Sequence, residues 1–273
     1  MTPRIWMAIV PLAAVLSLGC QDDHPTPSAQ LAATNTLLEC AARDLLGGST
    51  SVLRLAEPGS CPGHFDIRPS QVAQLRQCRL LLRLDFQKSL DRKLARACQQ
   101  GLRIAEIRVP GGLAEPDSYL AACDQAADAM VSAGLLSAGQ AEERLERIRQ
   151  RIADAAARSR ARVVPLKDTP VLASGHQAAF CRWLGLRVVE TFAGADTTAA
   201  GRLNRAVVAG EQAGVTLVIA NRPEGRRVAD ALAERLGAAT VVFGNFPAPD
   251  QGQSAFDDLL AANVRALLEA AGR

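Results

Sequence analysis

The sequence predicts an α/β fold with two lobes, each a parallel sheet flanked by helices, joined by a single long helix. Short apolar runs alternate with helical patterns in the first half, a long charged segment without proline breaks this rhythm, and the alternation then restarts. Strands that alternate with helices form βαβ units and a parallel sheet. Two such sheets place a cleft between the carboxyl ends of their strands, where open α/β sheets bind ligands.

The expected organisation has five parts. They are a signal peptide at 1–19, a tether at 20–29, an N-terminal lobe at 30–136, a linking helix at 137–162 and a C-terminal lobe at 163–273.

The N-terminus resembles a lipoprotein signal peptide. Arg4 supplies a positive charge, an apolar run follows, and Leu16-Ser-Leu-Gly stands directly before Cys20. The run is shorter than the roughly 20 residues that span a bilayer, which favours a cleaved signal over a permanent helix. We expect cleavage before Cys20, acylation of its thiol and an extracytoplasmic protein, periplasmic or at the cell surface, anchored by lipid. The alternatives are an uncleaved anchor and an ordinary signal with a chance cysteine.

The first lobe has a regular alternation of elements. The expected strands are 30–34, 51–56, 79–84 and 102–107, and the expected helices are 36–46, 70–76, 88–99 and 117–133.

The linking segment has the pattern of one continuous helix. Leu145, Ile148 and Ile152 recur at helical spacing and charges fill the other faces. A helix over 137–162 would be roughly 39 Å long, which suits a strut between two lobes. An ordinary surface helix followed by a loop is the alternative.

The second lobe repeats the alternation. The expected strands are 170–174, 186–192, 215–220 and 239–243, and the expected helices are 177–184, 198–213, 224–236 and 254–271.

Bulk composition narrows the class of partner. The 273 residues are 48% hydrophobic and 22% charged with a net charge of +3, as in ordinary globular proteins. The basic residues are scattered among acidic ones, and aromatic residues make up only 4%. We therefore expect no nucleic acid partner. We also expect a monomer.

Two of the three histidines follow predicted strands, one in each lobe. His64 ends a loop rich in proline and glycine, and His176 stands at a strand-to-helix junction. Neutral imidazole is a common ligand for zinc, copper and manganese-type ions. One histidine from each lobe is what a metal clamped between lobes requires. The alternative for each is a loop histidine that caps a helix or bonds to backbone.

Six cysteines remain after Cys20. They are Cys40, Cys61, Cys78, Cys98, Cys123 and Cys181. Three disulfides in any of 15 pairings, or small buried apolar side chains, both fit. Cys61 lies three residues before His64, and Cys181 five residues after His176. Two thiolates with two imidazoles would form a tetrahedral zinc site or a soft copper site.

The whole layout resembles the metal-binding receptors of zinc and manganese ABC importers. The matching motifs are Pro58-Gly-Ser-Cys-Pro-Gly-His64-Phe, Ser174-Gly-His176-Gln-Ala-Ala-Phe and the tail Asn263-Val-Arg-Ala-Leu. The resemblance implies a two-lobed receptor that binds a divalent metal, zinc or manganese, and delivers it to a membrane permease. It implies no enzymatic activity.

The resemblance also implies a ligand set, from which this chain departs. His64 and His176 match family ligands, but the other family positions fall on Asp117, Asn221 and Asn245. An asparagine oxygen carries no charge, so such a site would bind more weakly or prefer another ion. Asp85 also follows a strand and is a candidate for the cleft wall, whereas Glu224 has the pattern of a helix start with solvated charges.

Three alternative functions remain. In the first, a protein of the same fold binds an organic ligand or a metal chelate, because several metal-ligand positions of the family carry other residues in this chain. A second is a thiol-dependent hydrolase with Cys61 as nucleophile and His176 as base. The third is a sensor or scaffold without a transport role.

Overall fold

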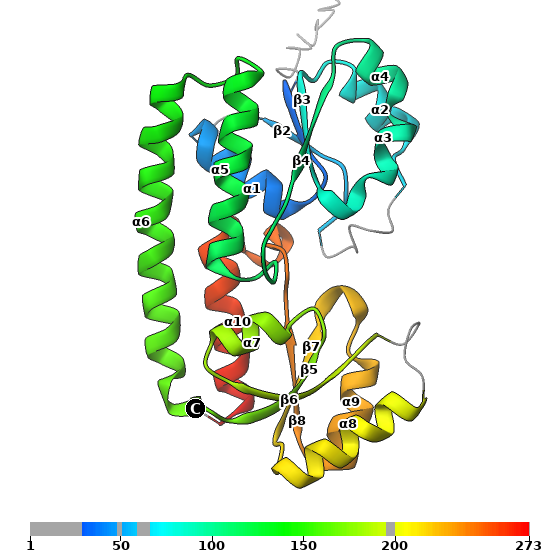
Figure 1. The fold of residues 1–273 in the computed structure, drawn as a ribbon, viewed down its shortest axis with the longest axis vertical. Helices are drawn as coiled ribbons and strands as arrows, with labels where there is room; N and C mark the ends of the chain where they lie inside the picture. The colour runs from blue at the N-terminus through cyan, green and yellow to red at the C-terminus, as the bar shows by residue number, and fades with distance from the viewer. Residues whose placement is uncertain (1–28, 48–50, 59–65, 195–199, 273) are drawn as a thin grey trace, which may run out of the picture.

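The computed structural model describes residues 29–47, 51–58, 66–194 and 200–272. Within them the chain forms two four-stranded parallel sheets, one in each lobe, with helices on both faces (Figure 1). No helix in these ranges is long and apolar enough to cross a membrane. The predicted fold class is confirmed.

The N-terminal sheet has the strand order β2-β1-β3-β4, and every pair is parallel. Its elements are β1 (Leu31–Ala33), α1 (Thr36–Leu46), β2 (Val52–Arg54), α2 (Pro69–Leu75), β3 (Leu80–Leu84), the 3₁₀ turn η1 (Asp85–Gln87), α3 (Ser89–Lys93), α4 (Ala95–Gln99), β4 (Arg103–Ile107) and α5 (Pro116–Ser132).

The C-terminal sheet repeats the same topology with the order β6-β5-β7-β8, again all parallel. Its elements are the 3₁₀ turn η2 (Val164–Leu166), β5 (Pro170–Ser174), α7 (Ala178–Trp183), β6 (Arg187–Phe192), α8 (Ala200–Ala213), β7 (Leu217–Asn221), η3 (Arg222–Glu224), α9 (Arg227–Leu236), β8 (Ala239–Phe243), η4 (Pro249–Gln251) and α10 (Phe256–Ala270).

Helix α6 (Ala138–Val163) joins the two lobes and runs beside both (Figure 1). It begins with a capping box, in which the Ser137 hydroxyl accepts from the Gln140 backbone and the Gln140 side chain accepts from the Ser137 backbone. Ile148 and Ile152 are buried on its inner face, as their spacing predicts. The predicted strut is therefore one uninterrupted helix.

One predicted helix is wrong. The segment 88–99 is two short helices, α3 and α4, that meet at Leu94. Leu94 leaves helical geometry, with φ −100° and ψ 3°, and its side chain is buried against the outer face of the N-terminal sheet with Leu81 and Ala97. Burial of this leucine sets the break, which no proline or glycine marks in the sequence.

The largest core cluster is shared by the two lobes. It contains residues of both sheets and of α1, α5, α6, α7 and α10. The ring of Tyr119 on α5 stacks on Phe256 of α10 with centroids 4.3 Å apart, and its hydroxyl donates to Asp44 of α1 at 2.6 Å. Arg151 of α6 donates to the same carboxylate through both terminal nitrogens. These contacts tie the linking helix and the last helix to the N-terminal lobe.

The five cysteines in the described ranges form no disulfide: Cys40, Cys78, Cys98, Cys123 and Cys181. All except Cys98 are buried. Desolvation raises the pKa of Cys40 to about 12 and that of Cys78 to about 11. The buried cysteines in this part of the chain therefore act as small apolar side chains and do not form a disulfide framework. Cys20 and Cys61 lie outside the described residues.

Candidate functional site

Both sheets reverse their strand order at the same internal point. The first strand of each sheet lies between the second and third, so the switch falls between β1 and β3 and between β5 and β7. Loops that leave such a point diverge to opposite faces and open a crevice at the carboxyl edge, where ligands bind. A small pocket lies where loops of the two lobes meet, lined by Pro58 after β2 and by residues after β7 and β8 that include Arg222 and Asn245. The candidate site is therefore at these two carboxyl edges.

At the N-terminal edge the switch point is closed by neutral hydrogen bonds. The Thr34 hydroxyl donates at 2.6 Å to the side-chain oxygen of Gln87, which also accepts from the Leu84 backbone at 2.9 Å. Asn35 caps α1 by accepting from the Leu38 backbone. Thr34, Asn35 and Gln87 are all buried. These three side chains therefore have structural roles at this edge.

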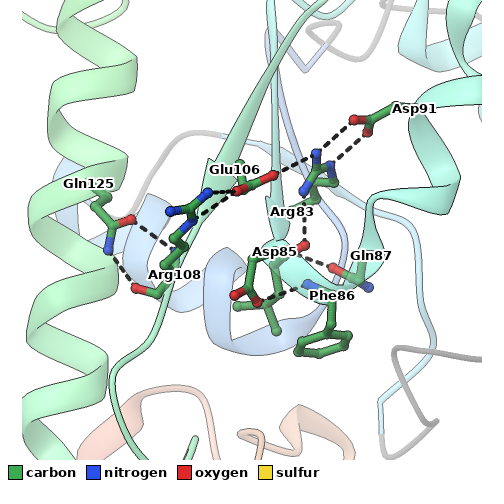
Figure 2. A network of polar contacts seen from close by, with 9 residues as sticks. Arg83, Asp85, Phe86, Gln87, Asp91, Glu106, Arg108 and Gln125 are labelled. Atoms are coloured by element: carbon green, nitrogen blue, oxygen red, sulfur yellow. Dashed lines mark hydrogen bonds and ion pairs between the residues drawn. The ribbon is translucent and has the colours of Figure 1, made fainter.

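The charged groups near the N-terminal edge pair with one another (Figure 2). The guanidinium of Arg83, buried on β3, donates to both oxygens of Asp91 at 2.7 Å and to Glu106 at 3.1 Å. Arg108 donates to the other oxygen of Glu106, and its backbone exchanges hydrogen bonds with Gln125. The hydrogen bond from Arg108 lowers the pKa of Glu106. Two cations and two anions thus neutralise each other.

Asp85 and Phe86 follow β3 directly and face solvent. The Asp85 carboxylate accepts from the Phe86 backbone at 2.8 Å, and the Phe86 side chain is 53% exposed. Figure 2 shows Asp85 apart from the ion pairs of Arg83. Asp85 is thus an exposed carboxylate at this edge, as its position after a strand predicts.

At the C-terminal edge three buried amides are joined by hydrogen bonds, although the Gln177 side-chain oxygen has no hydrogen-bond partner among the described residues. The Gln177 amide nitrogen donates to Asn221 at 3.1 Å and to Asn245 at 2.7 Å, and the Asn245 nitrogen donates to Asn221 at 2.9 Å. Asn221 and Asn245 end neighbouring strand regions, as predicted, and each is at most 4% exposed. The Asn221 oxygen accepts two hydrogen bonds, which uses both of its lone pairs.

Beside this network stands a histidine–carboxylate pair. His176 Nε2 lies 3.8 Å from Glu224 Oε1, and the imidazole is 67% exposed while Glu224 is 21% exposed. The other carboxylate oxygen accepts from the Ser174 hydroxyl at 2.5 Å, and Oε1 accepts from the Gly194 backbone at 3.2 Å. Three segments, which follow β5, β6 and β7, therefore meet at this carboxylate.

Glu224 was missed by reasoning from the sequence. The structure places it in η3, before α9 begins at Arg227, and its carboxylate is held by Ser174 and Gly194 rather than by solvent. The expectation of a solvated helix start is therefore wrong. The available signal was an acidic residue three positions after a strand, in a turn closed by Gly225 at φ 74°.

The described residues do not bring the remaining predicted ligands together. Asp117 is exposed in the first turn of α5. The loop before α5 approaches α7 closely, since a Cβ on Gly112 would lie 3.2 Å from Ala179. Cys181 is buried in α7, and desolvation raises its pKa to about 12. His64 and Cys61 lie outside the described residues, and within those residues no three His, Cys, Asp or Glu side chains form a group able to hold a metal.

Comparisons with known proteins identify the family. The sequence profile of the family described as "Zinc-uptake complex component A periplasmic" (ZnuA) matches residues 31–270. No curated protein matches the chain. The manganese-bound periplasmic metal binding protein of Candidatus Liberibacter asiaticus superposes with a TM-score of 0.75 at 11% identity, over 88% of this chain and 98% of that chain.

Two further solved structures have the same fold. The cadmium-bound form of the Liberibacter protein gives a TM-score of 0.74 at 11% identity. A crystal structure of ZnuA gives 0.72 at 14% identity, and both comparisons cover 88% of this chain and 98% of the other. Since the profile spans most of the sequence, this chain belongs to the ZnuA family.

Proposed function

We propose that this protein is an extracytoplasmic receptor that captures a divalent transition metal ion between its lobes and delivers it to the permease of an ABC importer. The observation that carries the proposal is the match of the ZnuA family profile across residues 31–270. The structures that share its fold are described as manganese-bound, as cadmium-bound and as ZnuA. Capture and release of an ion need no covalent chemistry, so we propose no enzymatic activity.

The proposed cargo is zinc or manganese, with copper as a less favoured alternative. The proposed ligands are His64 and His176, one from each lobe, with Asp117 and Cys61 beside them. Asn221 and Asn245 complete the predicted set as neutral oxygen donors, and both already form hydrogen bonds with Gln177 and with each other. Imidazole nitrogen suits all three metals, so histidine alone does not select among them.

The proposed mode of action is capture with limited lobe movement. The shared core and the contacts of Tyr119, Asp44 and Arg151 join the lobes along their helical side, away from the strand ends. This arrangement favours small adjustments of the loops at the carboxyl edges over a wide hinge opening.

We further propose a lipid anchor at Cys20. The support is the sequence Leu16-Ser-Leu-Gly-Cys20 after a short apolar run. Acyl chains hold a protein at a membrane by about 0.8 kcal/mol for each buried CH₂ group, which would keep the receptor near its permease. Mass spectrometry of the membrane fraction should find Cys20 as the acylated first residue. An unmodified Cys20 on a soluble precursor would refute the anchor.

The metal proposal is tested by titration of the two histidine variants. Loss of a ligand removes a bond to the metal. Loss of a residue that only hydrogen-bonds to a ligand, an outer partner, typically costs about 10- to 100-fold in metal affinity. We expect His64→Ala and His176→Ala each to weaken zinc or manganese binding beyond that range, with little loss of folding. Isothermal calorimetry on chelator-stripped protein measures both. Unchanged binding in both variants would favour an organic ligand or chelate instead.

A further inference from the structure

We propose that the carboxylate of Glu224, and not the amides of Asn221 and Asn245, is the anionic ligand that the C-terminal lobe presents to the metal together with His176. This inference rests on the proposed function and names a ligand of the same site. It comes from the position of Glu224 at the point where the strand order of the C-terminal sheet reverses.

The distance between the two side chains suits a shared ion better than a direct bond. His176 Nε2 and Glu224 Oε1 are 3.8 Å apart, which exceeds the roughly 3.2 Å limit of a good hydrogen bond. Two ligand atoms at about 2.0–2.2 Å from one tetrahedral zinc lie about 3.3–3.5 Å apart. The exposed imidazole would have to move only a few tenths of an ångström to reach that spacing.

The carboxylate is held in position by neutral donors. The Ser174 hydroxyl donates to Oε2, and the Gly194 backbone donates to Oε1. An ionised carboxylate oxygen has about two acceptor sites, so Oε1 keeps one for an ion. Gly194 is also required for close approach, because a Cβ there would lie 3.2–3.4 Å from three atoms of Glu224. Outer partners of this kind orient the ligands of metal sites.

The neighbouring amides are poorly placed to replace it. Asn221 has both lone pairs of its oxygen occupied, and the oxygen of Asn245 faces the amide group of Gln177. All three amides are buried and neutral. To bind a divalent cation, Asn221 would have to break a hydrogen bond inside the protein, and none of the three amides would offer a negative charge in return. Glu224 offers a charge and breaks nothing.

Glu224→Gln tests the proposal because it keeps the shape and removes the charge. The matched control is Asp258→Asn, since Asp258 also accepts from a serine hydroxyl and backbone N–H groups but has no histidine partner among the described residues. Zinc and manganese are titrated by calorimetry into the chelator-stripped protein, and the absorption spectrum of bound cobalt reports the coordination. The melting temperature without metal checks the fold of each variant.

We expect Glu224→Gln to lose more than the roughly 10- to 100-fold in affinity that an outer partner accounts for, and to change the cobalt spectrum. Asp258→Asn should bind as the original protein does. Ser174→Ala, which removes only the orienting hydroxyl, should fall within the 10- to 100-fold range. This second variant keeps the test decisive if Glu224→Gln does not fold.

The outcomes separate the two proposals. If the original protein binds zinc or manganese and both Glu224→Gln and Ser174→Ala bind it equally well, Glu224 is not a ligand, although the receptor function stands. If only Ser174→Ala folds and it binds as the original protein does, the inference also fails. If the original protein binds none of these metals, the proposed function itself is wrong.

Discussion

The carboxyl edges of the two sheets have the same topology but opposite electrostatic arrangements. At the N-terminal edge, Arg83 and Arg108 neutralise Asp91 and Glu106 in a continuous network. At the C-terminal edge, the carboxylate of Glu224 is held by a hydroxyl and a backbone N–H, with an exposed imidazole 3.8 Å away. The first arrangement satisfies its own charges, whereas the second retains a negative charge for a cation.

Two sheet edges with the same strand order are therefore not equivalent as ligand sites. A carboxylate that pairs with arginine stabilises the fold but is unavailable to a metal. A carboxylate that is positioned by neutral donors keeps its charge for an ion. We therefore expect substitution of Arg83 to change stability, and substitution of Glu224 to change metal affinity.

The largest stability effect is expected from Arg83→Met. Arg83 is buried, and its loss leaves Asp91 and Glu106 without their shared cation. Both acids are partly exposed, so we expect the free energy of unfolding to fall by about 1–3 kcal/mol, below the cost of breaking a fully buried pair. Chemical denaturation measures this change, and the zinc affinity of the folded variant should be unchanged. A large loss of zinc affinity in Arg83→Met with an unchanged free energy of unfolding would contradict the structural role of the Arg83 ion pairs.

A separate effect should come from alkaline pH, and it should involve both lobes. Cys40 and Cys181 lie in the shared core, and burial raises the pKa of each from 9.0 to about 12. A raised folded pKa means that the stabilisation is complete below pH 9 and is lost progressively as the pH rises toward 12. The free energy of unfolding should therefore fall with pH over this window.

Substitution of either thiol checks that assignment. Cys40→Ala and Cys181→Ala should each make the fall of unfolding free energy between pH 9 and 11 shallower, because one group that titrates only in the unfolded state is removed. Denaturation curves at several pH values measure the slope. An equally steep slope in the double variant would show that other groups cause the alkaline loss.

The smallest effect is expected from Asp66→Ala. Asp66 is an exposed carboxylate of the N-terminal lobe that pairs with Lys93 Nζ at 2.6 Å, and this hydrogen bond lowers its pKa. Exposed pairs of this kind contribute little, so neither the melting temperature nor the zinc affinity should change measurably. A marked loss of affinity would mean that Asp66 itself contributes to the metal site rather than only pairing with Lys93.

Much of the fold could be predicted from the sequence because local signals set it. Helix α1 has its predicted bounds, since Asn35 caps its start and Gly47 ends it in the left-handed conformation at φ 85°. Strands β5 and β8 also have their predicted bounds. The break at Leu94 could not be predicted, because it follows from burial against residues of other elements.

The site was less predictable because its contacts join distant residues. The positions of His176, Asn221 and Asn245 at strand ends follow from the alternation of elements. Their partners do not, because Gln177 bonds across 44 and 68 residues to the two asparagines. Ser174 likewise lies 50 residues from Glu224. Only the folded sheet brings these groups together, so sequence spacing alone suggested a solvated Glu224.

The most direct test of the account is a crystal structure of the zinc-loaded protein with diffraction data collected on both sides of the zinc absorption edge. A peak in the anomalous difference map that is strong only above the edge identifies the bound ion as zinc. We predict a peak between the lobes, about 2.0–2.2 Å from both His176 Nε2 and Glu224 Oε1, as zinc–nitrogen and zinc–oxygen bonds require. A zinc peak bonded to neither side chain, or no peak at saturating zinc, would contradict the account.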